Sequence, residues 1–329
     1  MRAILSKEVG GPETLVLEDV AVPAPGKGQV LIEVKACGVN YPDVLIIQDM
    51  YQFKPPRPFS PGGEISGIVS AVGEGVTHVK PGDRVLASTG NGGMAEYALA
   101  GGHGVMLIPE GMPYDEAAAF LMTYGTSYYA LKDRADPKPG EKLLVLGAAG
   151  GVGIAAVELG KAMGLEVIAA ASSQDKVDFC LGKGADKGLV YARELDRDGQ
   201  KKFSEDIKAI SGGGVDIIYD GVGGNYAEPA VRAMNWEGRF LVIGFPAGIP
   251  KLPLNLTLLK SCDVRGVFWG AAVARDPKAH QQNVAELFEL YKAGKIRPHV
   301  SNSYPLEKAA DAIRELQDRK AQGKVVVTL

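Results

Sequence analysis

The sequence predicts an α/β protein made of a β-rich domain and a doubly wound parallel sheet. Strands and helices of ~10 residues alternate between residues 143 and 244, as they do when helices cover both faces of a parallel sheet. Residues 1 to about 110 instead contain short strands separated by glycine and proline turns, which are typical of a β-rich domain. The 329 residues are enough for two domains of ~150 residues each.

Composition argues against several functions. The chain is 46% hydrophobic and 23% charged with a net charge of −3, so it has no basic field that would attract nucleic acid or an acidic membrane surface. Its three cysteines, Cys37, Cys180 and Cys262, lack C-x-x-C spacing and predict neither a disulfide framework nor a zinc ribbon. Because residues 1–15 lack the apolar core of a secretory signal, we expect a cytoplasmic protein.

The first domain is expected to be a partly barrel-like sheet. Apolar residues alternate along 30–36, and further short strands are predicted at 67–72 and 84–87. A helix then opens at Tyr114 with acidic residues in its first turn, and a second helical stretch is predicted over residues 126–134.

The second domain follows from the strands of the alternating segment. These are Leu143–Leu146, Glu166–Ala171, Gly188–Val190, Val215–Asp220 and Phe240–Gly244. Residues 256–260, followed by 262–267, are expected to supply a sixth strand. The long helix predicted at 277–293 and all later residues are assigned back to the first domain. The expected domains are therefore 1–123 with 268–329, and 124–267.

The turn between residues 147 and 153 is the strongest functional signal. A buried strand breaks into glycines and reopens as a helix, which places unpaired backbone N–H groups and a positive helix end where a pyrophosphate binds. Gly150 allows the backbone to approach the phosphates, and Gly153 allows the helix to pack closely on the strand. A membrane span is excluded because the apolar run is shorter than ~18 residues, while a glycine-rich turn without a ligand remains the alternative.

Six segments occur in an order that points to a known family. They are residues 38–43 (GVNYPD), 61–64 (PGGE), 82–85 (GDRV), 125–129 (GTSYY), 148–153 (AAGGVG) and 219–223 (YDGVG). With them the chain resembles the medium-chain dehydrogenase/reductase superfamily, and within it the zinc-free NADPH:quinone oxidoreductases related to ζ-crystallin. The resemblance implies a GroES-like β-rich catalytic domain, a Rossmann NADPH-binding domain, and a homodimer that pairs through the sixth strand.

The zinc alcohol dehydrogenases of this superfamily carry metal ligands that this chain lacks. The catalytic zinc of those enzymes would need a cysteine at Asn40 and a histidine at Gly63, and their four-cysteine structural loop is absent. We therefore expect no metal, and Glu64 is interpreted as structural. An unusual zinc site remains a second enzyme hypothesis.

The residues after the second strand predict the cofactor. An NAD enzyme places an acidic residue there to bind the ribose 2′-hydroxyl, whereas this chain has Ser172 and Ser173. By resemblance, these two serines, Lys176, Tyr191 and Arg319 bind the 2′-phosphate of NADPH. Hydroxyl donors and cations suit a phosphate. The alternative for Ser173 is a helix N-cap.

The remaining cofactor contacts are also implied by resemblance. Thr126 is expected near the nicotinamide ribose, although a helical threonine bonded to its own backbone is the alternative. Positions after the fifth and sixth strands are expected at the nicotinamide, because ligands bind at the carboxyl ends of parallel strands. The remaining expected cofactor residues are Ala149, Gly150, Gly151 and Val152 in the glycine turn, with Gly244, Phe245, Phe268 and Gly270 after those strands.

The predicted activity is NADPH-dependent, zinc-independent hydride transfer to a quinone or an α,β-unsaturated carbonyl. Such acceptors delocalise the incoming charge without a metal, and Asn40 or Tyr51 is expected to bind the acceptor oxygen or supply a proton. Asp43 matches the family motif but also suits a local cap. Some relatives carry a pocket tyrosine where this chain has Leu45, and relatives often have glycine where it has Asp49. A crystallin-like or RNA-binding protein that holds NADPH with little catalysis is the alternative function.

Overall fold

The computed structural model describes residues 1–329, and the chain divides into two units. The first unit joins Met1–Met122 to Pro298–Leu329, and the second is Thr123–Arg297. The first boundary lies next to the expected one. The second lies at 297/298 instead of 267/268, so residues 268–297 belong to the second unit.

Long-range polar contacts explain why the segment after residue 268 belongs to the second unit. Helix α10 (Pro277–Lys292) is tied to the helical stretch at 126–135 by a bond from the Tyr128 hydroxyl to the Glu286 carboxylate (2.6 Å). Lys132 forms an ion pair with the same carboxylate, and the Asn283 amide donates to Asp133 (2.7 Å). The assignment of this helix to the first domain was therefore wrong.

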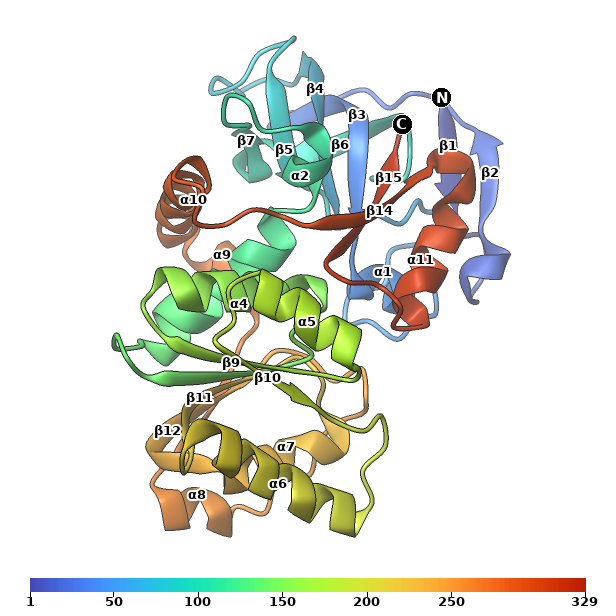
Figure 1. Cartoon of the computed structure of the whole chain (residues 1–329). Coiled ribbons are helices and arrows are strands. Elements are labelled where there is room, and N and C mark those ends of the chain that lie inside the picture. The colour runs from blue at the N-terminus through green and yellow to red at the C-terminus, as the bar shows by residue number, and fades with distance from the viewer. The chain divides into compact units, whose positions relative to one another are not determined.

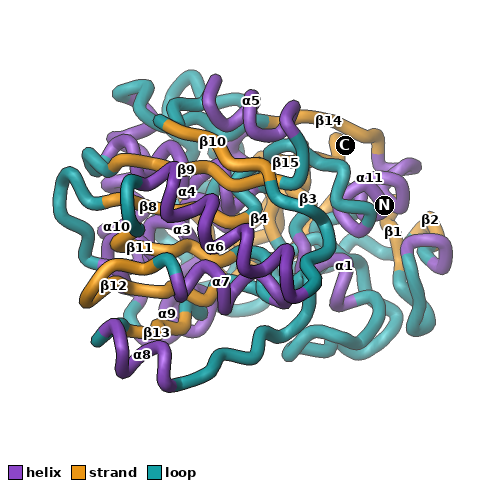
Figure 2. Tube along the Cα trace, turned by 60° about the horizontal axis from the view of Figure 1, so that its bottom comes forward, coloured by secondary structure: helices purple, strands orange, loops and turns teal.

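The second unit is built on the predicted parallel sheet, whose strands follow the order β10-β9-β8-β11-β12-β13 (Figure 2). All five neighbouring pairs are parallel. The first strand, β8, therefore lies beside the fourth, β11. The chain adds β9 and β10 on one side of β8, and then β11, β12 and β13 on its other side. The strands are β8 (Lys142–Leu146), β9 (Glu166–Ala171), β10 (Lys187–Val190), β11 (Val215–Asp220), β12 (Met234–Val242) and β13 (Asp263–Gly266).

Helices cover both faces of this sheet, as continuous apolar strands require. Figure 1 shows α4 (Gly151–Ala162) and α5 (Gln174–Gly182) on one face, and α6 (Arg197–Ser211) and α7 (Ala227–Arg232) on the other. The segment expected to lead into the sixth strand is instead helix α8 (Asn255–Lys260), and only Asp263–Gly266 is strand. That strand does lie at an edge of the sheet, as expected.

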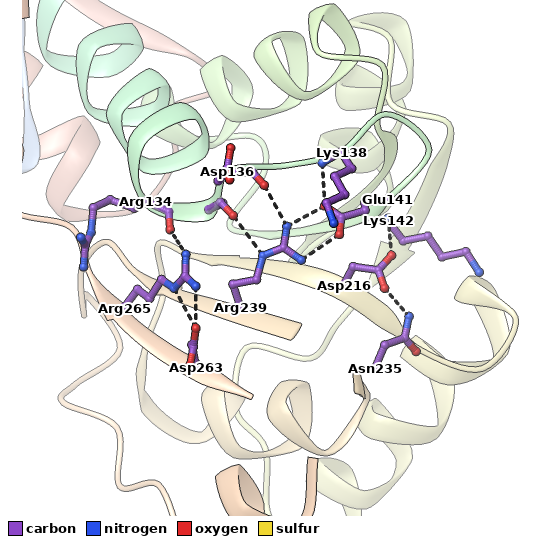
Figure 3. Close-up of polar contacts among 11 residues, drawn as sticks. Arg134, Asp136, Lys138, Glu141, Lys142, Asp216, Asn235, Arg239, Asp263 and Arg265 are labelled. Carbon is purple, nitrogen blue, oxygen red and sulfur yellow. Dashed lines mark hydrogen bonds and ion pairs between the residues drawn. The ribbon is translucent and has the colours of Figure 1, made fainter. Parts of the chain in front are cut away.

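Two arginines of the second unit anchor the end of the helical stretch at 126–135, which carries Thr126 (Figure 3). The Arg239 guanidinium donates to the Ala135 carbonyl (3.0 Å) and forms two bonds with the Glu141 carboxylate (2.9 and 2.6 Å). Arg265 donates to the Arg134 carbonyl. Cations at the final carbonyls of a helix satisfy its unpaired acceptors and complement its dipole. The stretch is irregular, with π-helical turns at Leu121–Gly125 and Tyr129–Ala135 on either side of α3 (Thr126–Tyr128).

The first unit contains a largely antiparallel sheet in the order β14-β15-β3-β4-β5-β7, with β6 also paired to β3. Two registers matter for the site. Gly38 on β3 lies opposite Glu64 on β4, and Val325 on β15 lies opposite Val39 on β3. The C-terminal strand is therefore a neighbour of the segment that ends at Asn40. The strands are β3 (Gln29–Val39), β4 (Glu64–Val72), β5 (Arg84–Ser88), β6 (Tyr97–Gly101), β7 (Val105–Leu107), β14 (Val300–Pro305) and β15 (Lys324–Thr328).

The other elements of the first unit surround this sheet. They are the small sheet of β1 (Arg2–Leu5) and β2 (Val16–Asp19), and helices α1 (Tyr41–Ile46), α2 (Tyr114–Ala118) and α11 (Ala309–Gln317). The predicted α/β class, with one β-rich unit and one doubly wound unit, is confirmed. None of the helices in residues 1–329 is long and apolar enough to cross a membrane.

Candidate functional site

The glycine turn lies where the sheet of the second unit changes direction, between β8 and β11. Gly147 has a φ of +71°, which a side chain rarely tolerates. A Cβ at Gly153 would lie 2.3 Å from the Gly147 carbonyl oxygen, so only glycine lets α4 start this close to the strand. Gly150 is the N-cap of α4, and no side chain caps the helix. The N–H groups of its first turn are thus available to an anion.

A buried hydrogen-bond chain fixes the start of α4. The Ser127 hydroxyl donates to the Val152 carbonyl (2.9 Å), and the Tyr219 hydroxyl lies 2.8 Å from the Ser127 hydroxyl. Ser127 and Tyr219 are completely buried. Their bonds connect α3, β11 and the glycine turn, and the next residue along α3 toward the N-terminus is Thr126. The sequence motif contained Ser127 and Tyr219 but gave no sign of this connection.

The loops after β11 and β12 are tied together beside the turn. The Asp220 carboxylate accepts bonds from the N–H groups of Val222 and Gly223 (both 2.9 Å), and burial raises the pKa of this carboxyl group. A Cβ at Gly223 would lie 2.9 Å from the Cβ of Phe245, so the two loops approach closely. Gly244 and half-exposed Phe245 therefore lie at the carboxyl edge of the sheet, as expected.

The end of β13 is less enclosed. Phe268 is exposed and precedes helix α9 (Trp269–Arg275), which contains Gly270. The Trp269 ring lies against the backbone next to Thr126, since a Cβ at Gly125 would lie 2.9 Å from that ring. Trp269 therefore packs within the second unit.

Three of the predicted phosphate-binding residues follow β9, and one of them, Lys176, lies near a second cation. Ser172 and Ser173 follow β9, and Ser173 is the N-cap residue of α5. Lys176 lies in the first turn of α5, and its pKa is lowered by burial and by the nearby guanidinium of Arg193. Arg193 follows β10, and no motif in the sequence pointed to it.

The other two residues expected at the phosphate have different surroundings. The Tyr191 ring is buried and packs against Phe203 and Tyr226, with ring centroids 5.8 and 4.9 Å apart. Arg319 belongs to the first unit, where its backbone has a φ of +57°.

The expected catalytic residue Asn40 lies in a buried polar cluster of the first unit, which we call the Asn40 cluster: Asn40, Glu64 and Lys324. The Lys324 ammonium donates to the Asn40 side-chain oxygen (2.7 Å) and to Glu64 Oε2 (3.0 Å). The Asn40 side-chain amide donates to Glu64 Oε2 (2.9 Å) and to the Gly38 carbonyl (3.2 Å). The Met122 N–H donates to Glu64 Oε1 (2.9 Å). Both hydrogens of the Asn40 amide are thus already used.

Asp43 supports the same region from the start of α1. Its carboxylate accepts bonds from the N–H groups of Asn40 (2.8 Å) and Gly62 (2.9 Å). Burial raises the pKa of this carboxyl group to about 6 despite these two bonds. The predicted capping role of Asp43 is therefore present.

Tyr51 lies in the loop that follows α1 and is half-buried. Burial and the charge of Asp43 raise the pKa of its phenol. Its hydroxyl has no hydrogen-bond partner within the protein, in contrast to the Asn40 amide. Of the two expected catalytic side chains, Tyr51 is the one with an available donor.

Two family models match parts of this chain. Residues 26–110 match the family model described as alcohol dehydrogenase GroES-like domain, and residues 184–327 match the one described as zinc-binding dehydrogenase. The human quinone oxidoreductase is 36% identical over all of this chain and 98% of its own length. Quinone oxidoreductase-like protein 2 homolog of Nematostella vectensis is 37% identical over 99% of this chain and 88% of its own. This chain belongs to the quinone oxidoreductase family of the medium-chain dehydrogenases/reductases.

Solved structures of the family have the same fold. The Escherichia coli quinone oxidoreductase in complex with NADPH has a TM-score of 0.91 and 29% identity, and each chain is covered completely. The Thermus thermophilus quinone oxidoreductase, also solved in complex with NADPH, has a TM-score of 0.86 and 33% identity over the full length of both chains.

One matching family model is described as zinc-binding, but the residues of this chain do not form a zinc site. No group of three or more His, Cys, Asp or Glu side chains is arranged to hold a metal ion. A side chain at Gly63 would place its Cβ 3.1 Å from the Gly90 carbonyl oxygen, so a histidine there would be crowded. The Lys324 ammonium already contacts Asn40 and Glu64. These residues do not fit zinc.

Proposed function

We propose that this protein catalyses NADPH-dependent, zinc-independent reduction of a quinone or an α,β-unsaturated carbonyl by hydride transfer. The observation that carries the proposal is the pair of cations, Lys176 and Arg193, which follow β9 and β10 on one side of the strand that leads into the glycine turn. Two like charges in proximity favour a bound anion, and no acidic residue directly follows β9 to bind a ribose hydroxyl instead. The NADPH complexes of related quinone oxidoreductases support this assignment.

The glycine turn is proposed to hold the pyrophosphate. Backbone N–H groups of Gly151 and Val152 face the anion at the uncapped start of α4, next to Ala149 and Gly150. Ser172, Ser173 and Lys176, with Arg193, are assigned to the 2′-phosphate, and Tyr191 and Arg319 remain proposed contributors. Thr126, Gly244, Phe245, Phe268 and Gly270 are assigned to the nicotinamide end.

NADPH, when bound, supplies the hydride. The protein then has to orient the acceptor and stabilise charge that develops on its oxygen. Tyr51 is proposed to donate a hydrogen bond or a proton to that oxygen, because its hydroxyl has no partner in the protein and its raised pKa keeps it protonated at neutral pH. Asn40 would reach the acceptor only by giving up one bond, and the longest is the 3.2 Å bond to the Gly38 carbonyl.

Turnover measurements test the proposal. NADPH oxidation is followed at 340 nm with a panel of quinones, enones and acyl thioesters, using protein dialysed against a chelator. We expect turnover with at least one quinone or enone, unchanged by chelation, and a lower kcat for Tyr51→Phe. NADPH binding without turnover of any acceptor would refute catalysis and favour a binding protein, and zinc-dependent turnover would refute the metal-free mechanism.

We also propose that the protein is a homodimer. Strand β13 has a free edge, and large apolar side chains in the segment that leads into it are exposed, including Leu254 (77%), Leu258 (80%) and Ile249 (80%). An unpaired edge next to exposed leucines is suited to pairing with a second copy across a two-fold axis.

A further inference from the structure

We propose that Lys324 is the resident cation of the acceptor site and the positioning residue that fixes the Asn40 amide. The Lys324 ammonium takes the place of a metal charge in the Asn40 cluster, and it holds the oxygen end of the amide while Glu64 and Gly38 hold the nitrogen end. The effect of Lys324 on catalysis rests on the proposed function, whereas its effect on the orientation of the Asn40 amide does not.

The position of the ammonium is closely defined. The Lys324 side chain is only 4% exposed, and the Glu64 side chain only 2%. A buried ammonium has to direct its hydrogens to acceptors in the protein, and here Asn40 Oδ1 and Glu64 Oε2 accept at 2.7 and 3.0 Å. Lys324 is the first residue of β15, which pairs with β3 next to Asn40, so the backbone also holds it in place.

The ammonium selects one orientation of the Asn40 amide. An ammonium group donates hydrogen bonds and accepts none, so only the amide oxygen can face it. The amide nitrogen must then point to Glu64 Oε2 and the Gly38 carbonyl, which are both acceptors. The same orientation of the amide therefore satisfies all three neighbours. Without the ammonium, the amide oxygen loses this donor, and the amide is held through its nitrogen alone.

The charge of the cluster also depends on Lys324. Glu64 and Asp43 are both buried carboxyl groups, and Lys324 is the cation that forms an ion pair with Glu64. Removing one partner of a buried pair leaves the other charge uncompensated, which is costly. A zinc ion would have to displace this ammonium, so the same residue accounts for the poor fit of a metal.

A double-variant experiment separates positioning from mere charge compensation. The full-length variants are Lys324→Met, Glu64→Gln and the combination, and Lys80→Met, an exposed lysine of the same unit, is the control. Thermal stability, kcat, the KM for NADPH and the side-chain amide resonances of Asn40 in a 15N-asparagine-labelled protein are measured for each.

Lys324→Met is expected to lower stability and to reduce kcat by about 10- to 100-fold with little change in the KM for NADPH. The double variant should regain part of the stability, because Glu64 no longer carries an unpaired buried charge. Its kcat should stay below that of Glu64→Gln, and its Asn40 resonances should shift or split relative to that single variant. Full recovery of kcat in the double variant would overturn the proposal.

Failure of the proposed function gives a different result. If the wild-type protein reduces no acceptor, the proposed function is refuted, and the Asn40 resonances alone decide the role of Lys324. Because Glu64 itself bonds the Asn40 amide, the double variant is compared with Glu64→Gln. Matching resonances in these two variants would show that Lys324 does not orient the amide. Resonances that shift or split between them, with the Lys80→Met spectrum unchanged, would support the positioning role.

Discussion

The Asp49 carboxylate forms an ion pair with the Arg57 guanidinium at 2.7 Å while the Asp49 backbone has a φ of +56°. Left-handed backbone of this kind favours glycine, the residue that the family resemblance led us to expect at this position. Arg57 also donates to the Ile47 carbonyl (2.9 Å). The two residues thus close the loop that carries Tyr51.

Substitution of Asp49 tests this balance of strain and ion pairing. Asp49→Ala keeps the left-handed backbone and loses the ion pair, so we expect a loss of about 1–2 kcal/mol in the free energy of unfolding. Asp49→Gly loses the same ion pair but relieves the strain, and its stability should lie within about 0.5 kcal/mol of the wild type. Urea denaturation measures both, and equal losses would contradict the role of the backbone.

Cofactor preference depends on the cations beside the glycine turn. Lys176→Glu and Arg193→Gln should raise the KM for NADPH by about 10-fold or more, because a charged hydrogen bond to phosphate is lost. The KM for NADH should change much less, since NADH has no 2′-phosphate. Lys201→Glu makes the same charge change on an exposed part of α6 and serves as the control. Equal effects on both cofactors would remove these residues from the phosphate site.

Local patterns made the sheet of the second unit and its glycine turn predictable from the sequence. The strand, turn and helix between Leu143 and Gly153 are adjacent in the sequence, so this segment alone predicts the site. The Asn40 cluster has no such signal: Lys324 lies 284 residues from Asn40 and 260 from Glu64, and only the pairing of β15 with β3 brings them together. Arg193 is the neighbour of Lys176 that the sequence did not predict. It lies near Lys176 only because β9 and β10 are adjacent in the sheet.

The placement of α10 could not be predicted for a related reason. The sequence predicted a helix at 277–293, but the unit to which it belongs is decided by polar contacts of Glu286 and Asn283 with residues about 150 positions earlier. The prediction of a strand at 256–260 was wrong for a different reason. A short leucine-rich run fits a helix or a strand equally well, and its tertiary surroundings decide.

The raised pKa of Asp43 predicts a specific pH dependence of stability. The folded pKa of about 6 exceeds the unfolded value of 3.8, so the folded state binds the proton more tightly. Stability from this group is therefore present below pH 3.8 and is lost as the pH rises through 6, by about 3 kcal/mol in total.

The comparison of wild type with Asp43→Asn isolates this contribution. Their difference in unfolding free energy should change steadily between pH 4.5 and 6.5 and become constant above it, as measured by urea denaturation at several pH values. A difference that does not vary with pH would mean that Asp43 titrates normally in the folded protein.

The buried chain from Tyr219 through Ser127 to Val152 should stabilise the glycine turn. Ser127→Ala leaves the Tyr219 hydroxyl and the Val152 carbonyl without this partner, which we expect to cost about 1–3 kcal/mol and to raise the KM for NADPH. Adding Tyr219→Phe removes one unsatisfied group, so stability should partly recover. A KM for NADPH that remains at the wild-type value in Ser127→Ala would show that the turn is held by other contacts.

The proposed dimer predicts different effects at the two edges of the parallel sheet. A glutamate at Leu258 would bring a charge into the interface beside β13, and the desolvation cost would exceed what the contact contributes, so Leu258→Glu should sediment as a monomer. Val190→Glu makes a similar change in an exposed apolar residue of β10, at the opposite edge, and should leave the dimer intact.

Since Lys176 and the glycine turn are independent of Leu258, NADPH affinity should be unchanged in the monomer. A wild-type protein that is monomeric at micromolar concentration would exclude this dimer, and a Leu258→Glu dimer would exclude α8 from the interface.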